Sequence, residues 1–214
     1  AGIIGSVKSP GLEELTIETN PAILDRQGYS TLLLAGFNRI SLGVQSFSNR
    51  SLRELGRIHD AEAAAEALKA IRQTGFRNVS ADLMYGLPGQ TPAEQKDDLE
   101  NLVKHSPEHI SLYELTLEKG TPMGEAGRKA SESVCADMYY QAHEFLTANG
   151  YVHYEVSSYA RGEEHISRHN SAYWKRAPYI GIGPSAHSFD GTVRSWNHSD
   201  ARAYESAVIR GEDP

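Results

Sequence analysis

The sequence predicts an α/β fold, in which short strands alternate with helices, followed by a smaller α+β domain. From Glu14 to Glu118, β-branched runs alternate with helical stretches at the spacing of successive βα units. A polar residue interrupts each strand-like run near its end, and after Gly120 the alternation stops. Because βα units make right-handed crossovers, we expect the strands to form one parallel sheet.

The individual elements follow in chain order. LTIET leads into a helix over 21–35, where Pro21 suits a helix start, and RISLGVQS leads into helices over 49–55 and 61–74. NVSADLMYG leads into a helix over 92–105, with Thr91 as N-cap and Glu94 three residues later, and HISLYELTLE completes the series. A helix over 131–149, the run YVHYEVSSYA and a Gly-, Pro- and aromatic-rich stretch follow. We therefore predict a partial βα domain over 1–125 and a C-terminal α+β domain, itself incomplete, over 126–214.

Composition excludes several classes of protein. The 214 residues are 39% hydrophobic and can bury a full core, and a formal charge of −7 without basic clusters argues against nucleic-acid binding. The longest apolar run, near 32–37, is too short to span a bilayer, and the first residues show no basic region followed by an apolar one. We expect a cytoplasmic location, with peripheral membrane contact left open.

The cysteine content restricts the possible disulfides and metal sites. A single cysteine, Cys135, excludes an internal disulfide framework and a multi-cysteine metal site built by this chain alone. The chain also begins with Ala1 rather than Met and soon enters a strand pattern, so we expect an internal piece of a longer protein.

The polar residues near the strand ends are the candidate binding groups. They are Glu18, Gln45, Asp82 and Glu114. An α/β barrel binds ligands at this position, and because buried carboxylates need partners, the four suggest one shared polar ligand. Singly, Glu18, Gln45 and Asp82 could equally be helix caps or loop-facing groups, although Asp82 lies too far inside its strand to cap the helix at 92.

Two loops add weaker candidates. The turn over 86–89, Gly-Leu-Pro-Gly, allows a ligand to approach the backbone closely, but such turns are common between a strand and a helix. Arg57 and His59 follow a strand-to-helix junction, where solvated surface groups are the more common explanation.

Several long motifs together resemble a known family. ETNP, NRISLGVQSF, LGRIH, DLMYGLPGQT, ISLYELTLEKGTP, YEVSSYA and HNSAYW resemble, in order and spacing, the radical S-adenosylmethionine (radical SAM) proteins related to oxygen-independent coproporphyrinogen III oxidase. LGRIH and HNSAYW resemble the heme-chaperone branch. The resemblance implies a partial, three-quarter TIM-type βα barrel, truncated here at its N-terminus, with a smaller domain covering its mouth.

The resemblance also implies cofactors and site residues. The family binds S-adenosylmethionine against a four-iron four-sulfur (4Fe-4S) cluster. By position, Glu18 meets a charged or hydroxyl part of S-adenosylmethionine, Gln45 and Asp82 bind its ribose or amino acid portion, and Arg57 pairs with its carboxylate. Thr116 stands near the adenine.

The chain departs from the family at the cluster. The CxxxCxxC loop that holds it is absent, and Cys135 cannot substitute, because ligation needs several thiolates. We therefore predict no metal ligands in this chain and no cluster on the isolated 214 residues, which a stable brown protein after anaerobic reconstitution would refute. No catalytic residue is identified.

His169 is the candidate heme ligand. Imidazole is a good axial ligand, and Tyr173 and Trp174 beside it can pack on a porphyrin, although a hydrogen-bonded packing role would also explain these residues. Further candidates that the sequence cannot rank are His153, His165 and His187, whereas Tyr151, Tyr154 and Tyr159 are expected to pack the small domain.

Three functions compete. The first is a heme chaperone that binds heme and passes it to an acceptor protein of unknown identity. The second is an oxidase that decarboxylates propionates of coproporphyrinogen in porphyrin biosynthesis. The third is a folding remnant without activity, since missing barrel strands would leave an exposed parallel edge.

Overall fold

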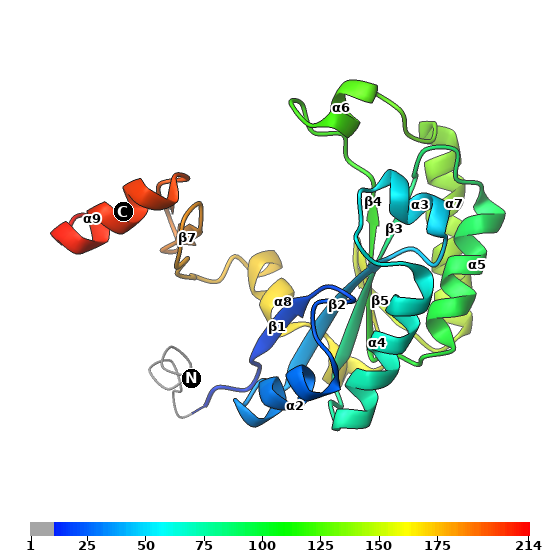
Figure 1. Cartoon of the computed structure of the whole chain (residues 1–214), viewed down its shortest axis with the longest axis horizontal. Coiled ribbons are helices and arrows are strands. Elements are labelled where there is room, and N and C mark those ends of the chain that lie inside the picture. The colour runs from blue at the N-terminus through cyan, green and yellow to red at the C-terminus, as the bar shows by residue number, and fades with distance from the viewer. Residues whose placement is uncertain (1–10) are drawn as a thin grey trace. The chain divides into compact units, whose positions relative to one another are not determined.

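The computed structural model describes residues 11–214 and divides into two compact units, Ala1–Ile166 and Ser167–Pro214. Figure 1 shows the elements of both units, which we describe separately.

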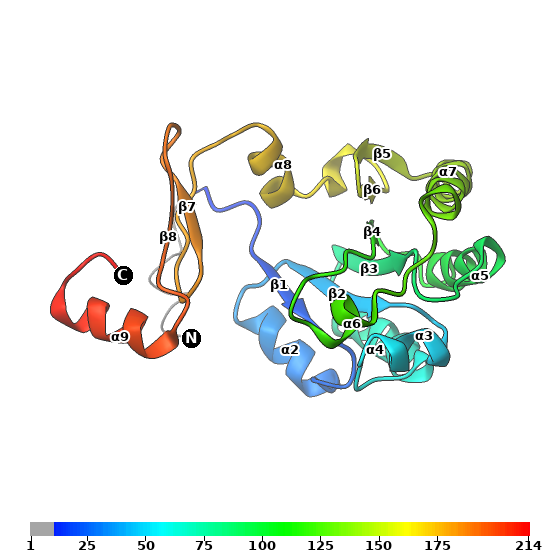
Figure 2. The ribbon, with the colours of Figure 1, turned by 90° about the horizontal axis from the view of Figure 1, so that it is seen from above.

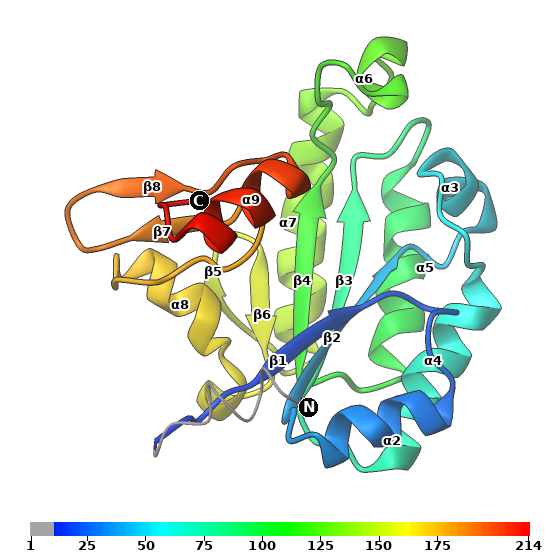
Figure 3. The ribbon, with the colours of Figure 1, turned by 60° about the vertical axis from the view of Figure 1, so that its left-hand side comes forward.

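A six-stranded sheet organises the first unit. Its order is β1-β2-β3-β4-β6-β5, and the first four strands are mutually parallel, whereas β6 pairs antiparallel with both β4 and β5. The strands are β1 (Thr16–Thr19), β2 (Arg39–Gln45), β3 (Val79–Tyr85), β4 (His109–Glu114), β5 (Val152–Glu155) and β6 (Ser158–Ala160). In Figure 3 the parallel strands run toward one edge, and their carboxyl ends lie together there.

Helices cover one side of this sheet. They are α2 (Arg26–Leu34), α3 (Asn49–Glu54), α4 (Ala61–Thr74), α5 (Pro92–Val103) and α7 (Glu132–Ala148), and the short α6 (Pro122–Ala126) follows β4. Seen from above, the strands form a curved row with these helices on its outer side (Figure 2). The α2–α4 and α5–α7 contacts join neighbouring helices into that layer, so the first unit is an open, partial βα barrel.

The predicted helices are confirmed with adjusted ends. α4 has the predicted bounds, and α5 begins with the predicted capping box, in which Thr91 and Glu94 each bind the other's backbone N–H. The predicted start of the first helix at Pro21 is wrong. α2 begins at Arg26, because the Asp25 side chain caps it by accepting from the Gly28 N–H.

The two faces of the sheet differ in chemistry. Side chains alternate along a strand, so Ile40, Leu42, Leu83 and Ile110 face the helices and are almost fully buried in the hydrophobic core. The alternate residues face inward and are largely polar: Glu18, Arg39, Ser41, Ser80, Asp82, His109 and Ser111.

His109 anchors the inner face. Its Nδ1 lies 2.8 Å from the Ser80 hydroxyl and its Nε2 lies 2.8 Å from the Tyr154 hydroxyl, so one nitrogen donates and the other accepts. Burial, with Arg39 and His165 nearby, lowers the pKa of His109 to about 3. The ring therefore stays neutral and links β3, β4 and β5.

The first compact unit extends beyond the boundary predicted near 120–130. β6 pairs with β4, and α7 packs on α5, so the chain as far as Ile166 shares the barrel's core. Tyr151 and Tyr159 accordingly pack in the first unit rather than in a separate small domain, and the Tyr151 hydroxyl donates to the Pro107 carbonyl at 2.7 Å. That residues 126–214 cover the barrel mouth stays a prediction.

The second unit is small and weakly buried. It contains α8 (Arg168–Trp174), an antiparallel hairpin of β7 (His187–Phe189) and β8 (Arg194–Trp196), and α9 (Ala201–Arg210). Only Ser167 and Ala207 of this unit are buried, so most of its aromatic side chains keep an accessible face. In the described part of the chain, no helix has the length and apolar character needed to cross a membrane.

Candidate functional site

Asp82 lies on the inner face, at the centre of the parallel strands. The Ser41 hydroxyl donates to its Oδ1 at 3.2 Å, and its strand position is in register with Ser111. Burial raises the pKa of Asp82 to about 6; hydrogen bonds from Ser111 and Ser41 oppose this shift, and the nearby Glu18 adds to it. The structure thus places two of the strand-end candidates, Glu18 and Asp82, near each other and beside two serines.

Gln45 ends β2 in a strained conformation. Its φ is +67°, in the left-handed region, and the β2–β3 register shifts between Leu42 and Gln45. A Cβ on Gly43 would lie 2.9 Å from the Gln45 Nε2 and 2.6 Å from the Asn20 Oδ1, so a larger residue would displace the ends of these two side chains. Strain of this kind is characteristic of functional sites.

The Arg57 side chain also contacts Asn20. Its Nη1 donates to the Asn20 Oδ1 at 3.5 Å, a long hydrogen bond that links the loop after α3 to the end of β1. Asn20 was missed in the sequence, although it stands in the ETNP motif directly after the first strand. Gln45 and Arg57 therefore gather around Asn20.

His59 is not a solvated surface group. Its side chain is 5% exposed, and its Nε2 lies 3.1 Å from the Val44 carbonyl, to which it donates. Since Val44 directly precedes Gln45, His59 supports the strained end of β2.

Asp98 holds the loop that follows Gln45. Its carboxylate accepts from the Phe47 N–H at 2.6 Å and from the Ser46 hydroxyl at 2.8 Å. Burial raises its pKa to about 6, and these two hydrogen bonds oppose the shift. The sequence does not reveal this role of Asp98, because a carboxylate within an amphipathic helix carries no signal that it turns toward a neighbouring loop.

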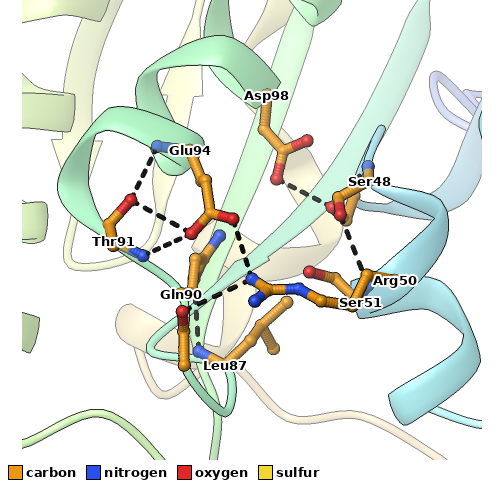
Figure 4. A network of polar contacts seen from close by, with 10 residues as sticks. Ser48, Arg50, Ser51, Leu87, Gln90, Thr91, Glu94 and Asp98 are labelled. Carbon is orange, nitrogen blue, oxygen red and sulfur yellow. Dashed lines mark hydrogen bonds and ion pairs between the residues drawn. The ribbon is translucent and has the colours of Figure 1, made fainter.

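A second set of contacts ties the loops after β2 and β3 together (Figure 4). Arg50 binds Glu94 at 2.9 Å and the Gly89 carbonyl at 3.4 Å, while the Gln90 side chain accepts from the Leu87 N–H at 3.2 Å. The Gly86–Gly89 turn is thereby fixed beside α3.

Glu114 and Thr116 do not join this site. The expectation that Glu114 shares it is wrong, because strand alternation turns Glu114 to the helix-covered face, where Lys129 Nζ lies 3.1 Å away and Cys135 is close. Thr116 is exposed after β4, and its role near an adenine stays a prediction.

The donor set of the inner face fits S-adenosylmethionine. Carboxylates accept from ribose hydroxyls or an ammonium group, an arginine fork pairs with a carboxylate, and Gly43 leaves room in the cradle. The residues present do not fit the cluster. The 214 residues contain one cysteine, Cys135, whose thiol pKa is raised by burial, and residues 11–214 hold no group of three or more possible metal ligands.

His169 lies in an aromatic row of the second unit. Its ring meets Tyr173 edge-on at 4.9 Å between centroids, and Tyr173 meets Tyr179 in the same way at 4.7 Å. Of the other candidates, His153 lies in the first unit, stacked on Tyr159 at 4.1 Å, and the His187 ring lies tilted against Trp196 at 6.0 Å between centroids. The geometry therefore favours neither His169 nor His187 alone.

Known proteins resemble this chain in sequence and in fold. Residues 3–102 match the radical SAM superfamily. The heme chaperone HemW of Escherichia coli is 41% identical over 175 residues, which cover 81% of this chain and 46% of that protein. HemW of Lactococcus lactis is 38% identical over 203 residues, covering 92% and 53%. The chain thus spans about half the length of these curated relatives.

A solved structure supports the fold assignment. The coproporphyrinogen III oxidase HemN from Escherichia coli, a radical SAM enzyme, superposes with a TM-score of 0.78 at 25% identity, covering 94% of this chain and 50% of that chain. The predicted partial TIM-type barrel is confirmed by this likeness.

Proposed function

Because residues 3–102 match the radical SAM superfamily and heme chaperones are among the relatives of the chain, we propose that it is the heme-binding and S-adenosylmethionine-binding part of a chaperone that passes heme to acceptor proteins. The observation that carries the proposal is the 41% identity to a heme chaperone over 81% of the chain. We place this function in the cytoplasm. S-adenosylmethionine and the 4Fe-4S cluster belong to the superfamily's chemistry, and here we assign them a supporting role.

We assign heme binding to the second unit. His169 offers an imidazole, and Tyr173 stands edge-on beside it at 4.9 Å, so an aromatic side chain adjoins the candidate iron ligand. Most side chains of this unit are accessible, as a binding protein that must release its ligand requires.

Hemin titration tests this assignment. Purified protein should give a saturable Soret shift that His169→Ala abolishes, while the control His198→Ala, an exposed histidine of the same unit, retains it. Loss in His187→Ala instead would transfer the ligand role to His187. Absence of any shift in the wild type would contradict heme binding by these residues.

We assign the S-adenosylmethionine site to Glu18, Gln45, Arg57, Asp82 and Thr116. The proximity of Glu18 to Asp82, and of Gln45 and Arg57 to Asn20, supports this assignment, and Arg57 is the group suited to the ligand's carboxylate. Calorimetry with S-adenosylhomocysteine, which carries the same adenine, ribose and amino acid portions, provides the test. Arg57→Ala should weaken binding about tenfold or more, since a hydrogen bond to a charged group contributes ~1.5–3 kcal/mol. Arg53→Ala, an exposed control on α3, should leave binding unchanged.

The oxidase remains a second candidate, favoured by the likeness to HemN in fold. An oxidase must release carbon dioxide and form protoporphyrinogen from coproporphyrinogen, whereas a chaperone yields bound heme and no such product. Product analysis of a protein containing this chain together with the cluster-binding loop separates the two functions.

A further inference from the structure

A cavity beside the aromatic row of the second unit combines apolar walls with positive charge. It measures about 340 Å³ and is lined by Tyr173, Tyr179 and Phe189 together with Arg176 and Arg194. This volume lies within the range of small-molecule sites, ~300–1,000 Å³.

The aromatic wall is held in place by the backbone. Tyr179 and Phe189 exchange two backbone hydrogen bonds, at 2.8 and 2.9 Å, which attach the segment after α8 to the β7–β8 hairpin. The Tyr179 ring meets Tyr173 at 4.7 Å and Phe189 at 6.3 Å between centroids. The row that begins at His169 thus continues along the cavity.

A hydrogen bond to the aromatic wall orients the Arg194 side chain. Its Nη2 donates to the Tyr179 hydroxyl at 3.2 Å, which leaves the other N–H groups of the guanidinium available. Within residues 11–214, no carboxylate forms an ion pair with Arg194 or with Arg176.

Arg176 occupies the position after α8 where glycine is usual. Its φ is +53°, and its N–H donates to the Tyr173 carbonyl at 3.0 Å as the helix ends. A left-handed conformation is unfavourable for arginine and persists only where the surrounding structure holds it.

The one carboxylate in the hairpin turn is already engaged. Asp190 accepts from the N–H groups of Thr192 and Val193 at 2.7 and 2.8 Å, and these hydrogen bonds lower its pKa to about 2. The charges of the two arginines therefore remain available to an external anion.

We propose that this cavity binds the carboxylate side chains of a flat, conjugated macrocycle, with the aromatic wall packed on its face and Arg176 and Arg194 paired with its carboxylates. The inference rests on the proposed heme function and extends it, since heme carries two propionates. Arginine is suited to this role because its planar fork binds carboxylates in a bidentate manner. The cavity holds the propionate-bearing edge, while iron ligation is a separate contact.

The test compares hemin with hemin dimethyl ester, in which both carboxylates are blocked. The wild type should bind hemin at least about tenfold more tightly than the ester. The double variant Arg176→Gln/Arg194→Gln should lose this preference and keep the Soret shape, whereas the exposed control Arg202→Gln should behave as the wild type. Arg176→Lys/Arg194→Lys should restore part of the preference, because the charge returns without the fork.

Each outcome has a distinct meaning. If the wild type binds both compounds equally, or if the double variant keeps the preference, the carboxylate site is overturned while the heme function stands. If the wild type binds neither compound, the heme function and the site fail together.

Discussion

The two faces of the sheet in the first unit have different roles, although the same strands form both. The face toward the helices buries Leu83 and Ile110 at 1% exposure or less, in a continuous apolar core. The inner face carries Asp82, His109 and their hydroxyl partners, held by specific hydrogen bonds. The outer face therefore supplies most of the stability through apolar burial, and the inner face supplies positioned polar groups that a ligand can use.

The largest expected loss of stability follows from a substitution on the face that the helices cover. Leu83→Ala should lower the free energy of unfolding by ~2–5 kcal/mol, because Leu83 is 1% exposed and its loss leaves a cavity. Met84 is the next residue along the strand and lies half-buried on the inner face. Met84→Ala should therefore lower the free energy of unfolding clearly less. Urea unfolding measures both, and equal losses would mean that the two faces do not differ in this way.

The next effect is a dependence on pH. Because the pKa of Asp98 is raised from 3.8 to about 6, the folded state between these values holds a proton that the unfolded state has released. The contribution of Asp98 to the free energy of unfolding is therefore present below pH 4 and is lost as pH rises through 6. Compared with Asp98→Asn, the wild type should lose about 3 kcal/mol of stability in total as pH rises from below 4 to above 6, at ~1.4 kcal/mol per pKa unit.

The comparison with Asp98→Asn is necessary because other groups also titrate. His109, with its pKa lowered to about 3, acts in the opposite direction, since its contribution is lost as pH falls below its ordinary value of 6.5. Asp82, with its pKa also raised to about 6, acts like Asp98. Urea midpoints at pH 4, 5, 6 and 7 would contradict the assignment if wild type and variant ran parallel.

A smaller effect is expected for the inner-face network. Tyr154→Phe removes the hydroxyl that lies 2.8 Å from the His109 Nε2 and leaves that nitrogen without this partner. We expect a loss of ~1 kcal/mol, with no change for the matched control Tyr140→Phe, whose ring is 66% exposed. Thermal unfolding of both variants provides the measurement, and an unchanged Tyr154→Phe would assign the network no structural role.

The smallest expected loss of stability comes from breaking the contact between the loops after β2 and β3. Arg50→Ala breaks the ion pair with Glu94, whose side chains are 45% and 39% exposed, and it should cost less than ~1 kcal/mol. The loss should shrink further in high salt, because exposed charges are screened. A loss as large as that of Leu83→Ala would show that the loops, and not the core, limit stability.

The sequence determined most of the elements of the first unit and part of its site. Periodicity and capping residues placed α4 and α5, because a 14-residue amphipathic helix and a capping box are local signals. Strand-end position predicted Glu18, Gln45 and Asp82 as candidate binding groups, because the carboxyl ends of parallel strands meet at one edge of a sheet.

Only the tertiary structure decided which polar groups share a face and which distant segments join the barrel. Alternation along β4 turned Glu114 away from Asp82, and a register shift in β2 set Gln45 over Gly43 beside Asn20. The turn of Asp98 toward Phe47, the pairing of β6 with β4, and the gathering of Arg176 and Arg194 at one cavity depend on contacts between residues far apart in the chain. Such contacts follow from how helices and strands pack together, and no local pattern of residues encodes them.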